Sequence, residues 1–307
     1  MKLVSKDNTK RRLNIEVTPI VKKIEALTKR LVQTKVLGEY ISVFKGAGLE
    51  FDGFKAYTPD MDGGEIDWKA SVRAKELLVK KYREIRELQV YFLLDVSESM
   101  VFGSTEKLKN EYSVEFLLAL SYTILTAGDS VGTIVFSDHV VHRISAGKGT
   151  TQFYRMARCL VDPTLYGGGY DLNKAADFAL NFIKKRGSVV IIVSDFYGLK
   201  ETAWQKKLKL MAAKFDLVCV IIRDPRDKEL PSDVGQVMIE DPYSGNRLVI
   251  DSKLLKKRYE SYTKKQDKEL ISFFDENNID YIELATNKDY LDAMFTFFNM
   301  RKKNIRR

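Results

Sequence analysis

The sequence predicts an α/β protein, and two observations lead to that fold class. Several short runs are continuously apolar, as strands buried on both faces of a sheet are. These runs alternate with longer segments whose apolar residues recur at helical spacing. Strands that alternate with helices imply parallel crossovers, so we expect a mostly parallel central sheet of Rossmann-like topology, flanked by helices on both faces.

The apolar runs account for the predicted strands. They are rich in β-branched and aromatic side chains and are bounded by polar residues or glycine. In chain order they cover residues 88–95, 131–137, 139–145, 188–195, 216–224 and 279–286. Residues 236–251 predict a hairpin around Ser244-Gly245-Asn246, which we interpret as an insertion near 235–251.

The segments with helical spacing carry start and stop signals. Gly128 follows the first of them, Asp171 stands near the start of another, and Gly187 follows the basic end of that one. The predicted helices cover residues 106–129, 150–162, 171–187, 200–215, 252–278 and 289–303.

Residues 1–87 have a different pattern. The part up to about Leu37 is mostly helical in character, and glycines, turn signals and short alternating stretches follow it. We therefore expect a small helical and β-rich or irregular N-terminal subdomain at 1–87, packed on the sheet of a second domain at 88–307. Trp68 is predicted to anchor the one to the other by packing.

Composition and charge exclude several classes of protein. The net charge is +9, but residues 1–35 carry ten Lys/Arg against three Asp/Glu, and residues 300–307 carry five Lys/Arg. The stretch between them is slightly negative, so we expect no nucleic-acid partner, which would need cations clustered on the folded surface.

The sequence also bears on location. It contains no run of about 18 apolar residues, so no membrane span is expected. Its start has basic residues but no apolar core of a secretory signal. Cys159 and Cys219 each lie in apolar surroundings and are interpreted as small buried side chains rather than a disulfide. A cytoplasmic location is the expectation.

Polar residues follow two of the predicted strands at the edge where such sheets bind ligands. Asp95 ends the first strand, and Ser97 and Ser99 follow it at alternate positions. Asp195 ends another strand and could supply a second carboxylate, directly or through water. Hydroxyl and carboxylate oxygens are the ligands that Mg²⁺ prefers. The alternative is structural: Asp95 caps a turn and a serine caps the next helix.

A glycine-rich loop provides a third segment. Residues 166–171 read "YGGGYD", and glycines let a backbone approach closely. The run "DVSES" is similar to the Asp-x-Ser-x-Ser motif of the metal-ion-dependent adhesion site in von Willebrand factor A domains. The run "GGGYD" falls where such domains place Gly-Gly-Thr, and "VSDF", residues 193–196, falls where they place a third-loop Asp.

A longer segment resembles the signature of the domain of unknown function 58 family. Residues 46–82 read "GAGLEFDGFKAYTPDMDGGEIDWKASVRAKELLVKKY" and contain its Gly-x-Gly-x-Glu-Phe and Ile-Asp-Trp elements. The likeness covers roughly residues 25–300. It implies a von Willebrand factor A-like domain and a partnership with a MoxR-type AAA+ ATPase in the maturation or remodelling of other proteins.

The sequence departs from these patterns at two places. Tyr170 stands where the adhesion site has Thr, and its phenol oxygen lies too far from the backbone to take the same ligand position. Asp171 could substitute, or the metal could bind weakly or not at all. The Arg that the family often places before Ile-Asp-Trp is also absent, although Asp62, Glu65 and Asp67 keep the segment acidic.

Three functions follow. The first is a non-catalytic adaptor that binds Mg²⁺ through Asp95, Ser97, Ser99 and Asp195 and accepts a carboxylate of a partner. The second is a similar binding module whose metal site has decayed. The third is a Mg²⁺-dependent phosphohydrolase with Asp95 as nucleophile. Such enzymes generally carry a second carboxylate where this chain has Ser97, so we expect that the protein is not an enzyme.

Overall fold

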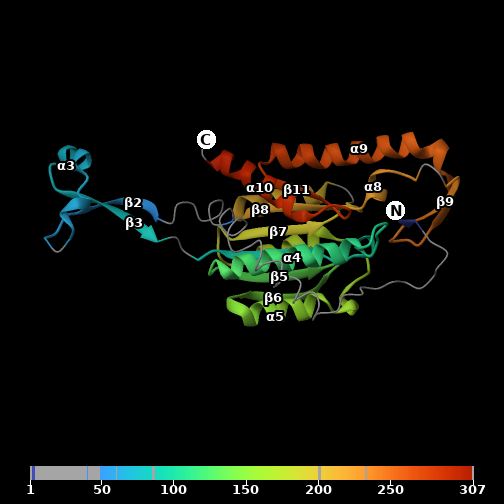
Figure 1. Cartoon of the computed structure of the whole chain (residues 1–307), viewed down its shortest axis with the longest axis horizontal. Helices are drawn as coiled ribbons and strands as arrows, with labels where there is room; N and C mark the ends of the chain where they lie inside the picture. Colours follow the sequence, from blue (N-terminus) through green and yellow to red (C-terminus); the bar gives the residue numbers. More distant parts are fainter. Residues whose placement is uncertain are drawn as a thin grey trace.

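A six-stranded sheet forms the centre of the protein (Figure 1). The computed structural model describes residues 2–3, 40, 49–59, 61–84, 87–199, 202–231 and 234–305. The strand order is β11-β8-β7-β4-β5-β6, and every neighbouring pair is parallel except β5 and β6. The strands are β4 (Gln89–Asp95), β5 (Ser130–Phe136), β6 (Val140–Gly147), β7 (Val189–Ser194), β8 (Asp216–Arg223) and β11 (Asp280–Ala285). This arrangement confirms the predicted fold class.

Helices cover both faces of the sheet, and the alternation of side chains along β4 shows how. Val90, Phe92 and Leu94 belong to one buried cluster, whereas Tyr91 and Leu93 belong to the other. Successive residues of a strand point to opposite faces, so a run that is apolar throughout needs a helical layer on each side. The first face carries α4 (Lys109–Thr126), α5 (Gly149–Leu160) and α10 (Tyr290–Ile305), and the second carries α6 (Leu172–Phe182), α7 (Ala203–Lys214) and α9 (Ser252–Glu276).

The predicted hairpin is present and belongs to a second sheet. The order of this antiparallel sheet is β1 (Lys2–Leu3), β9 (Gln236–Glu240) and β10 (Arg247–Asp251). Val237 and Ile250 pack with Leu230 in a small apolar core of their own. Residues 2–3 are therefore a strand, although we expected helix up to about Leu37; most of that segment lies outside the described residues.

The region that resembles the family signature forms a separate two-stranded unit. It consists of β2 (Leu49–Ala56), α3 (Trp68–Ala74) and β3 (Leu78–Glu84), with β2 and β3 antiparallel. Asp67 caps α3 by accepting hydrogen bonds from the Lys69 and Ala70 N–H groups, at 3.1 and 3.0 Å. The Ile-Asp-Trp element therefore begins a helix.

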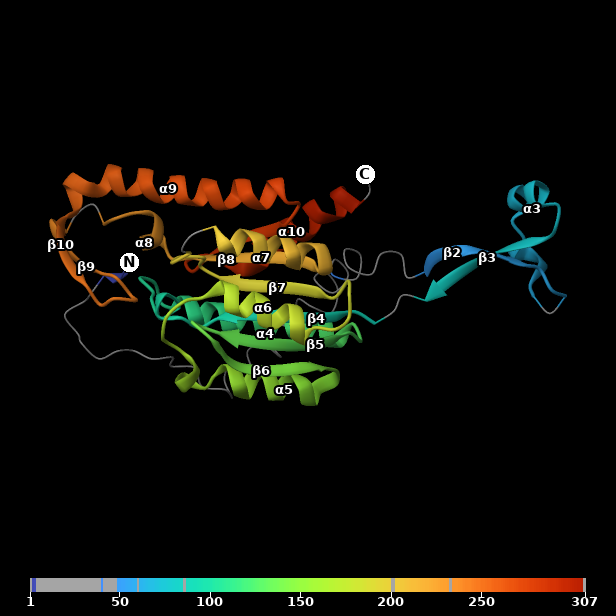
Figure 2. The same cartoon turned by 180° about the vertical axis from the view of Figure 1, so that it is seen from behind.

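This unit does not pack on the sheet as we expected. Figures 1 and 2 both show it beyond the end of the sheet, not against either face. Trp68 is 65% exposed, so the predicted packing anchor is wrong. The division of the chain near residue 87 remains a prediction.

Tyr40 shows how a residue before the sheet attaches to it. Its ring is buried among side chains of the first face, and its hydroxyl donates to Asp129 Oδ2 at 2.8 Å. The other carboxylate oxygen of Asp129 accepts from the Leu88 N–H at 3.0 Å. The hydrogen bonds therefore tie Tyr40 to the start of β4.

Two expectations about the chain as a whole can be compared with the structure. No helix within the described ranges is long and apolar enough to cross a membrane. Cys159 and Cys219 are both free thiols; Cys219 is buried and Cys159 is half-buried.

Remaining short elements connect these parts. They are η3 (Gly63–Glu65), η4 (Glu98–Met100), η5 (Pro163–Leu165) and α8 (Pro225–Lys228). Both η4 and α8 lie at the carboxyl edge of the sheet, directly after β4 and β8 respectively, so they shape the candidate site.

Candidate functional site

The predicted loop after β4 and the predicted glycine-rich loop lie against each other at the carboxyl edge of the sheet. The Gly167 N–H donates to the Val96 carbonyl oxygen at 2.7 Å, and the Glu98 N–H donates to the Gly168 carbonyl oxygen at 3.0 Å. Gly167 and Gly168 have φ of +121° and +87°. These values favour glycine, so the glycine run is needed for the loop to lie beside the loop after β4.

Asp95 is buried at the centre of this edge. Its Oδ1 accepts from the Ser97 N–H at 2.8 Å, and its Oδ2 accepts from the Ser194 hydroxyl at 2.6 Å. The Ser97 and Ser99 hydroxyl oxygens lie 3.2 Å apart. Burial, together with the negative charge of Asp195, raises the pKa of Asp95 to about 7. The first loop thus brings two hydroxyl groups, those of Ser97 and Ser99, close to a poorly solvated carboxyl group.

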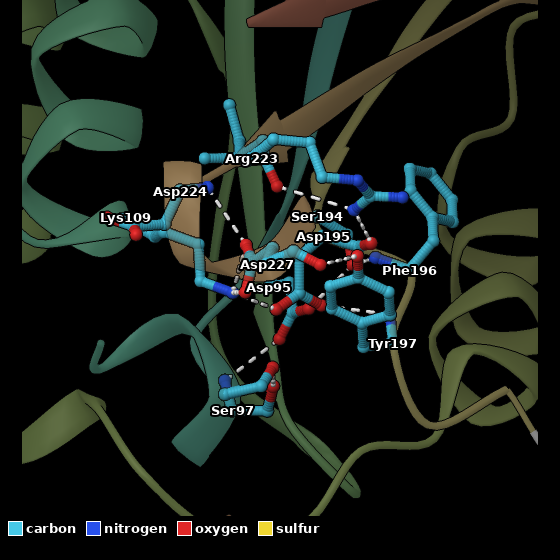
Figure 3. Close-up of polar contacts among 12 residues, drawn as sticks. Asp95, Ser97, Lys109, Ser194, Asp195, Phe196, Tyr197, Arg223, Asp224 and Asp227 are labelled. Atoms are coloured by element: carbon cyan, nitrogen blue, oxygen red, sulfur yellow. Dashed lines mark hydrogen bonds and ion pairs between the residues drawn. The ribbon is translucent and has the colours of Figure 1, made fainter. Parts of the chain in front are cut away.

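Asp195 has a cation of its own, the ammonium group of Lys109. Lys109 Nζ lies 2.6 Å from Asp195 Oδ2 and 3.1 Å from Asp227 Oδ2 (Figure 3). All three side chains are at most 2% exposed. Burial raises the pKa of Asp195, but the Lys109 charge and hydrogen bond outweigh burial and hold that pKa below its usual range. Asp195 is therefore ionised and paired.

Local structure explains how Lys109 and Asp227 reach this point. Lys109 is the first residue of α4, which begins beside the loop after β4. Asp227 lies in α8, where a capping box holds it: its Oδ2 accepts from the Asp224 N–H at 2.8 Å. Asp224 in turn accepts hydrogen bonds from the Ser104 hydroxyl and N–H, at 2.5 and 2.8 Å. The ion pairs therefore connect α4 to the loops after β7 and β8.

Arg223 also contacts the loop after β7, which begins with Asp195. Its Nη1 donates to the Asp195 carbonyl oxygen, and its Nη2 lies 2.6 Å from Asp267 Oδ1. The guanidinium carbon lies 4.4 Å from the centre of the Tyr197 ring, which is a cation–π contact. These contacts fix the backbone that carries Asp195 (Figure 3).

Tyr170 and Asp171 lie near the site in different roles. The Tyr170 hydroxyl is 3.3 Å from Ser194 Oγ, and burial with the nearby Asp95 charge raises its pKa. Asp171 caps α6, because its Oδ1 accepts from the Asn173 and Lys174 N–H groups at 3.0 and 3.3 Å. The structure thus uses the carboxylate that we considered as a substitute ligand to begin a helix.

The structure adds a residue from the hairpin, Tyr243. Its hydroxyl lies 3.0 Å from Ser99 Oγ and 3.2 Å from the Tyr197 carbonyl oxygen. A cavity of about 440 Å³ adjoins the site, and its lining includes Tyr170, Tyr243, Gly198 and Trp204. Asp95 is not part of that lining and is fully buried, and the hydroxyls of the two tyrosines contact Ser194 and Ser99 beside it.

The residues present fit a divalent cation in part. Within the described part of the chain, no cationic side chain lies within ion-pair distance of Asp95. Ser97 and Ser99 offer hard oxygens beside it, which suits Mg²⁺. The oxygens of Asp195 already contact Lys109 and the Tyr197 N–H. The first-loop residues therefore suit Mg²⁺ by donor chemistry, whereas Asp195 is engaged elsewhere.

Sequence reasoning missed Lys109, Asp227, Arg223 and Tyr243. Lys109 lies 86 residues before Asp195 and 118 before Asp227. Its sequence signal was weak: a lysine at the start of a long apolar helix, where a cation is unfavourable next to the helix dipole unless a carboxylate faces it. Tyr243 could have been noticed as an aromatic residue at the tip of a hairpin inserted after a strand end.

Comparisons with known proteins bear on the family. A model of the family described as "Protein of unknown function DUF58" matches residues 54–269. An uncharacterized protein of Mycobacterium bovis, Mb1516, is 28% identical over 224 residues, which cover 72% of this chain and 69% of that protein. The uncharacterized Mycobacterium avium protein MAV169 is 37% identical over 86 residues, which cover 27% of this chain and 48% of that protein.

Solved structures with similar folds include two kinds of protein. The conserved hypothetical protein BatB from Bacteroides thetaiotaomicron aligns with a TM-score of 0.44 and 16% identity, over 70% of this chain and 99% of that one. A von Willebrand factor type A structure from Catenulispora acidiphila aligns with a TM-score of 0.40 and 12% identity, over 74% of this chain and 45% of that one.

Proposed function

This chain belongs to the DUF58 family of proteins of unknown function, and we propose that it is a non-catalytic protein-binding module. In this proposal the binding position is the carboxyl edge of the sheet. Asp95, Ser97 and Ser99 hold Mg²⁺ there, and a carboxylate of a partner protein completes the metal's ligands. A bound divalent cation would supply the positive charge that joins the two carboxylates.

The surroundings of Asp95 carry the proposal. Two carboxylates, Asp95 and Asp195, lie near enough for the charge of one to raise the pKa of the other, and Lys109 contacts only Asp195 of the two. A buried carboxylate without a paired cation is costly to ionise. A metal ion at Ser97 and Ser99 would remove that cost, so the site favours a cation.

The burial of Asp95 also bears on the catalytic alternative. Asp95 is fully buried, and both of its oxygens accept hydrogen bonds from the chain itself. A nucleophilic carboxylate needs an open approach to its substrate. The phosphohydrolase alternative therefore gains no support from the geometry.

We further propose that the partner is a MoxR-type AAA+ ATPase, with this chain as the adaptor to a client protein that is matured or remodelled. The support is the family resemblance of the sequence. The chain contains no Gly-x-x-x-x-Gly-Lys-Ser/Thr phosphate loop, so ATP hydrolysis would come from the partner.

A capture experiment tests the proposal. The purified chain is immobilised and incubated with native lysate in Mg²⁺ or in EDTA, and the Asp95→Asn variant is treated in the same way. Asp171→Asn serves as the matched control, because Asp171 lies close by but caps α6. Capture of an AAA+ ATPase that requires both Mg²⁺ and Asp95 is the expected result. Capture of the same ATPase under all conditions would instead support a metal-independent module.

A further inference from the structure

The tip of the β9–β10 hairpin closes the candidate site. Tyr243 lies in the turn that connects the two strands. Its hydroxyl is within hydrogen-bond distance of Ser99 Oγ and of the Tyr197 carbonyl oxygen, at 3.0 and 3.2 Å. Ser99 belongs to the loop after β4, and Tyr197 to the loop after β7. One side chain from the hairpin thus contacts two of the loops that form the site.

The position of the Tyr243 ring depends on a glycine in the loop after β7. Gly198 has φ of +86°, and a Cβ added there would lie 2.8 Å from Tyr243 Cε2. Any other residue at position 198 would be strained and would collide with the ring. The absence of a side chain at Gly198 therefore leaves the space that Tyr243 fills.

The hairpin is also ordered around the tyrosine. The Tyr243 N–H donates to Asp241 Oδ1 at 3.0 Å, and the Asp241 N–H donates to the Asn246 carbonyl oxygen at 2.9 Å. At the base of the hairpin, Val237 and Ile250 pack with Leu230. The turn that carries Tyr243 is thus held by its own hydrogen bonds and by packing at the base of the hairpin.

We propose that the hairpin is a lid and that Tyr243 is an internal occupant of the position where a metal ion and a partner's carboxylate enter. This inference rests on the proposed function and concerns regulation of the same site. With Tyr243 in this position, its hydroxyl contacts Ser99, and Asp95 is fully buried. The lid must lift before Ser97 and Ser99 can accept Mg²⁺, so the seated state competes with the loaded state.

Variants of Tyr243 test the lid in the full-length chain. Tyr243→Phe removes the hydroxyl and keeps the ring, and Tyr243→Ala removes the whole occupant. Leu248→Ala is the matched control, because Leu248 lies on the same hairpin and is exposed. Mg²⁺ binding is measured by titration calorimetry, and hydrogen exchange of residues 96–101 is measured by mass spectrometry without metal.

We expect Tyr243→Ala to bind Mg²⁺ on the order of tenfold more tightly than wild type, as loss of about two competing hydrogen bonds implies. The Mg²⁺ affinity of Tyr243→Phe should lie between those of wild type and Tyr243→Ala. The affinity of Leu248→Ala should match that of wild type. Exchange at residues 96–101 should rise in Tyr243→Ala. If exchange at residues 96–101 is the same in Tyr243→Ala as in wild type, the lid is refuted, whatever the Mg²⁺ affinities are.

The two readouts separate this inference from the proposed function. Asp95-dependent Mg²⁺ binding that is equal in wild type and Tyr243→Ala would overturn the lid and leave the metal-dependent module standing. Faster exchange in Tyr243→Ala with no Mg²⁺ binding by any form would support closure by Tyr243 and overturn the magnesium site.

Discussion

Replacing Lys109 by methionine tests the charge arrangement most directly. The ammonium contacts Asp195 and Asp227 at 2.6 and 3.1 Å, and all three side chains are at most 2% exposed. Methionine keeps much of the volume but leaves two buried carboxylates without their shared cation. Removing one partner of a buried ion pair costs about 3–5 kcal/mol of unfolding free energy. We expect a loss of that size at pH 8, together with a drop of roughly 10 °C in Tm.

The loss should depend on pH. In wild type, the Lys109 charge holds the pKa of Asp195 low against the effect of burial. Without Lys109, that pKa should rise above its value in the unfolded chain, so the folded state takes up a proton as the pH falls. The cost of the substitution is then largest at pH 8 and shrinks toward pH 5.

Urea unfolding followed by circular dichroism at pH 8 and pH 5 provides the assay. Lys206→Met is the control, because Lys206 is exposed on α7 and its loss should change the unfolding free energy by less than about 0.5 kcal/mol. Lys109→Met/Asp195→Asn should recover part of the stability at pH 8. A loss below about 1 kcal/mol at pH 8, or an equal loss at both pH values, would refute the reasoning.

Three further predictions concern other contacts. Burial raises the pKa of Asp95 to about 7, so metal-free Asp95→Asn should unfold at a higher temperature than wild type at pH 8 and lose that advantage as the pH falls toward 4; a constant difference would contradict this. Tyr40→Phe removes the hydrogen bond to Asp129 and should cost about 1–2 kcal/mol in urea unfolding, and a cost near zero would contradict it. Gly198→Ala should cost about 1–2 kcal/mol, less in a Tyr243→Ala background; additive costs would show that ring and methyl do not collide.

Much of the fold was predictable because it depends on local patterns. The strands at β4, β7 and β8 are apolar throughout, and only a sheet covered on both faces hides such runs. The convergence of Asp95 with Ser97 and Ser99 also follows from a short spacing after one strand. The sequence-based argument failed for Trp68, because an aromatic residue beside a helix cap has the same pattern whether a partner surface covers it or not.

The electrostatic partners were not predictable for a physical reason. Lys109 contacts two carboxylates that are far away in the chain, and no periodicity relates their positions. The same holds for Tyr243, whose place over Ser99 depends on how the hairpin folds back. Asp171 illustrates the opposite case: the helix-start signal seen in the sequence describes its role better than its resemblance to a ligand position does.

The two tryptophans differ in exposure, so their intrinsic fluorescence can report on two parts of the protein. Trp68 stands 65% exposed on α3, whereas Trp204 is 8% exposed and its ring lies 4.8 Å from that of Phe273. An exposed indole emits at longer wavelength and is quenched by iodide, and a buried one is shielded from it. Fluorescence of an unlabelled sample can therefore follow the surface of α3 and the cavity beside Tyr243 as two separate signals, one red-shifted and quenchable, the other blue-shifted and protected.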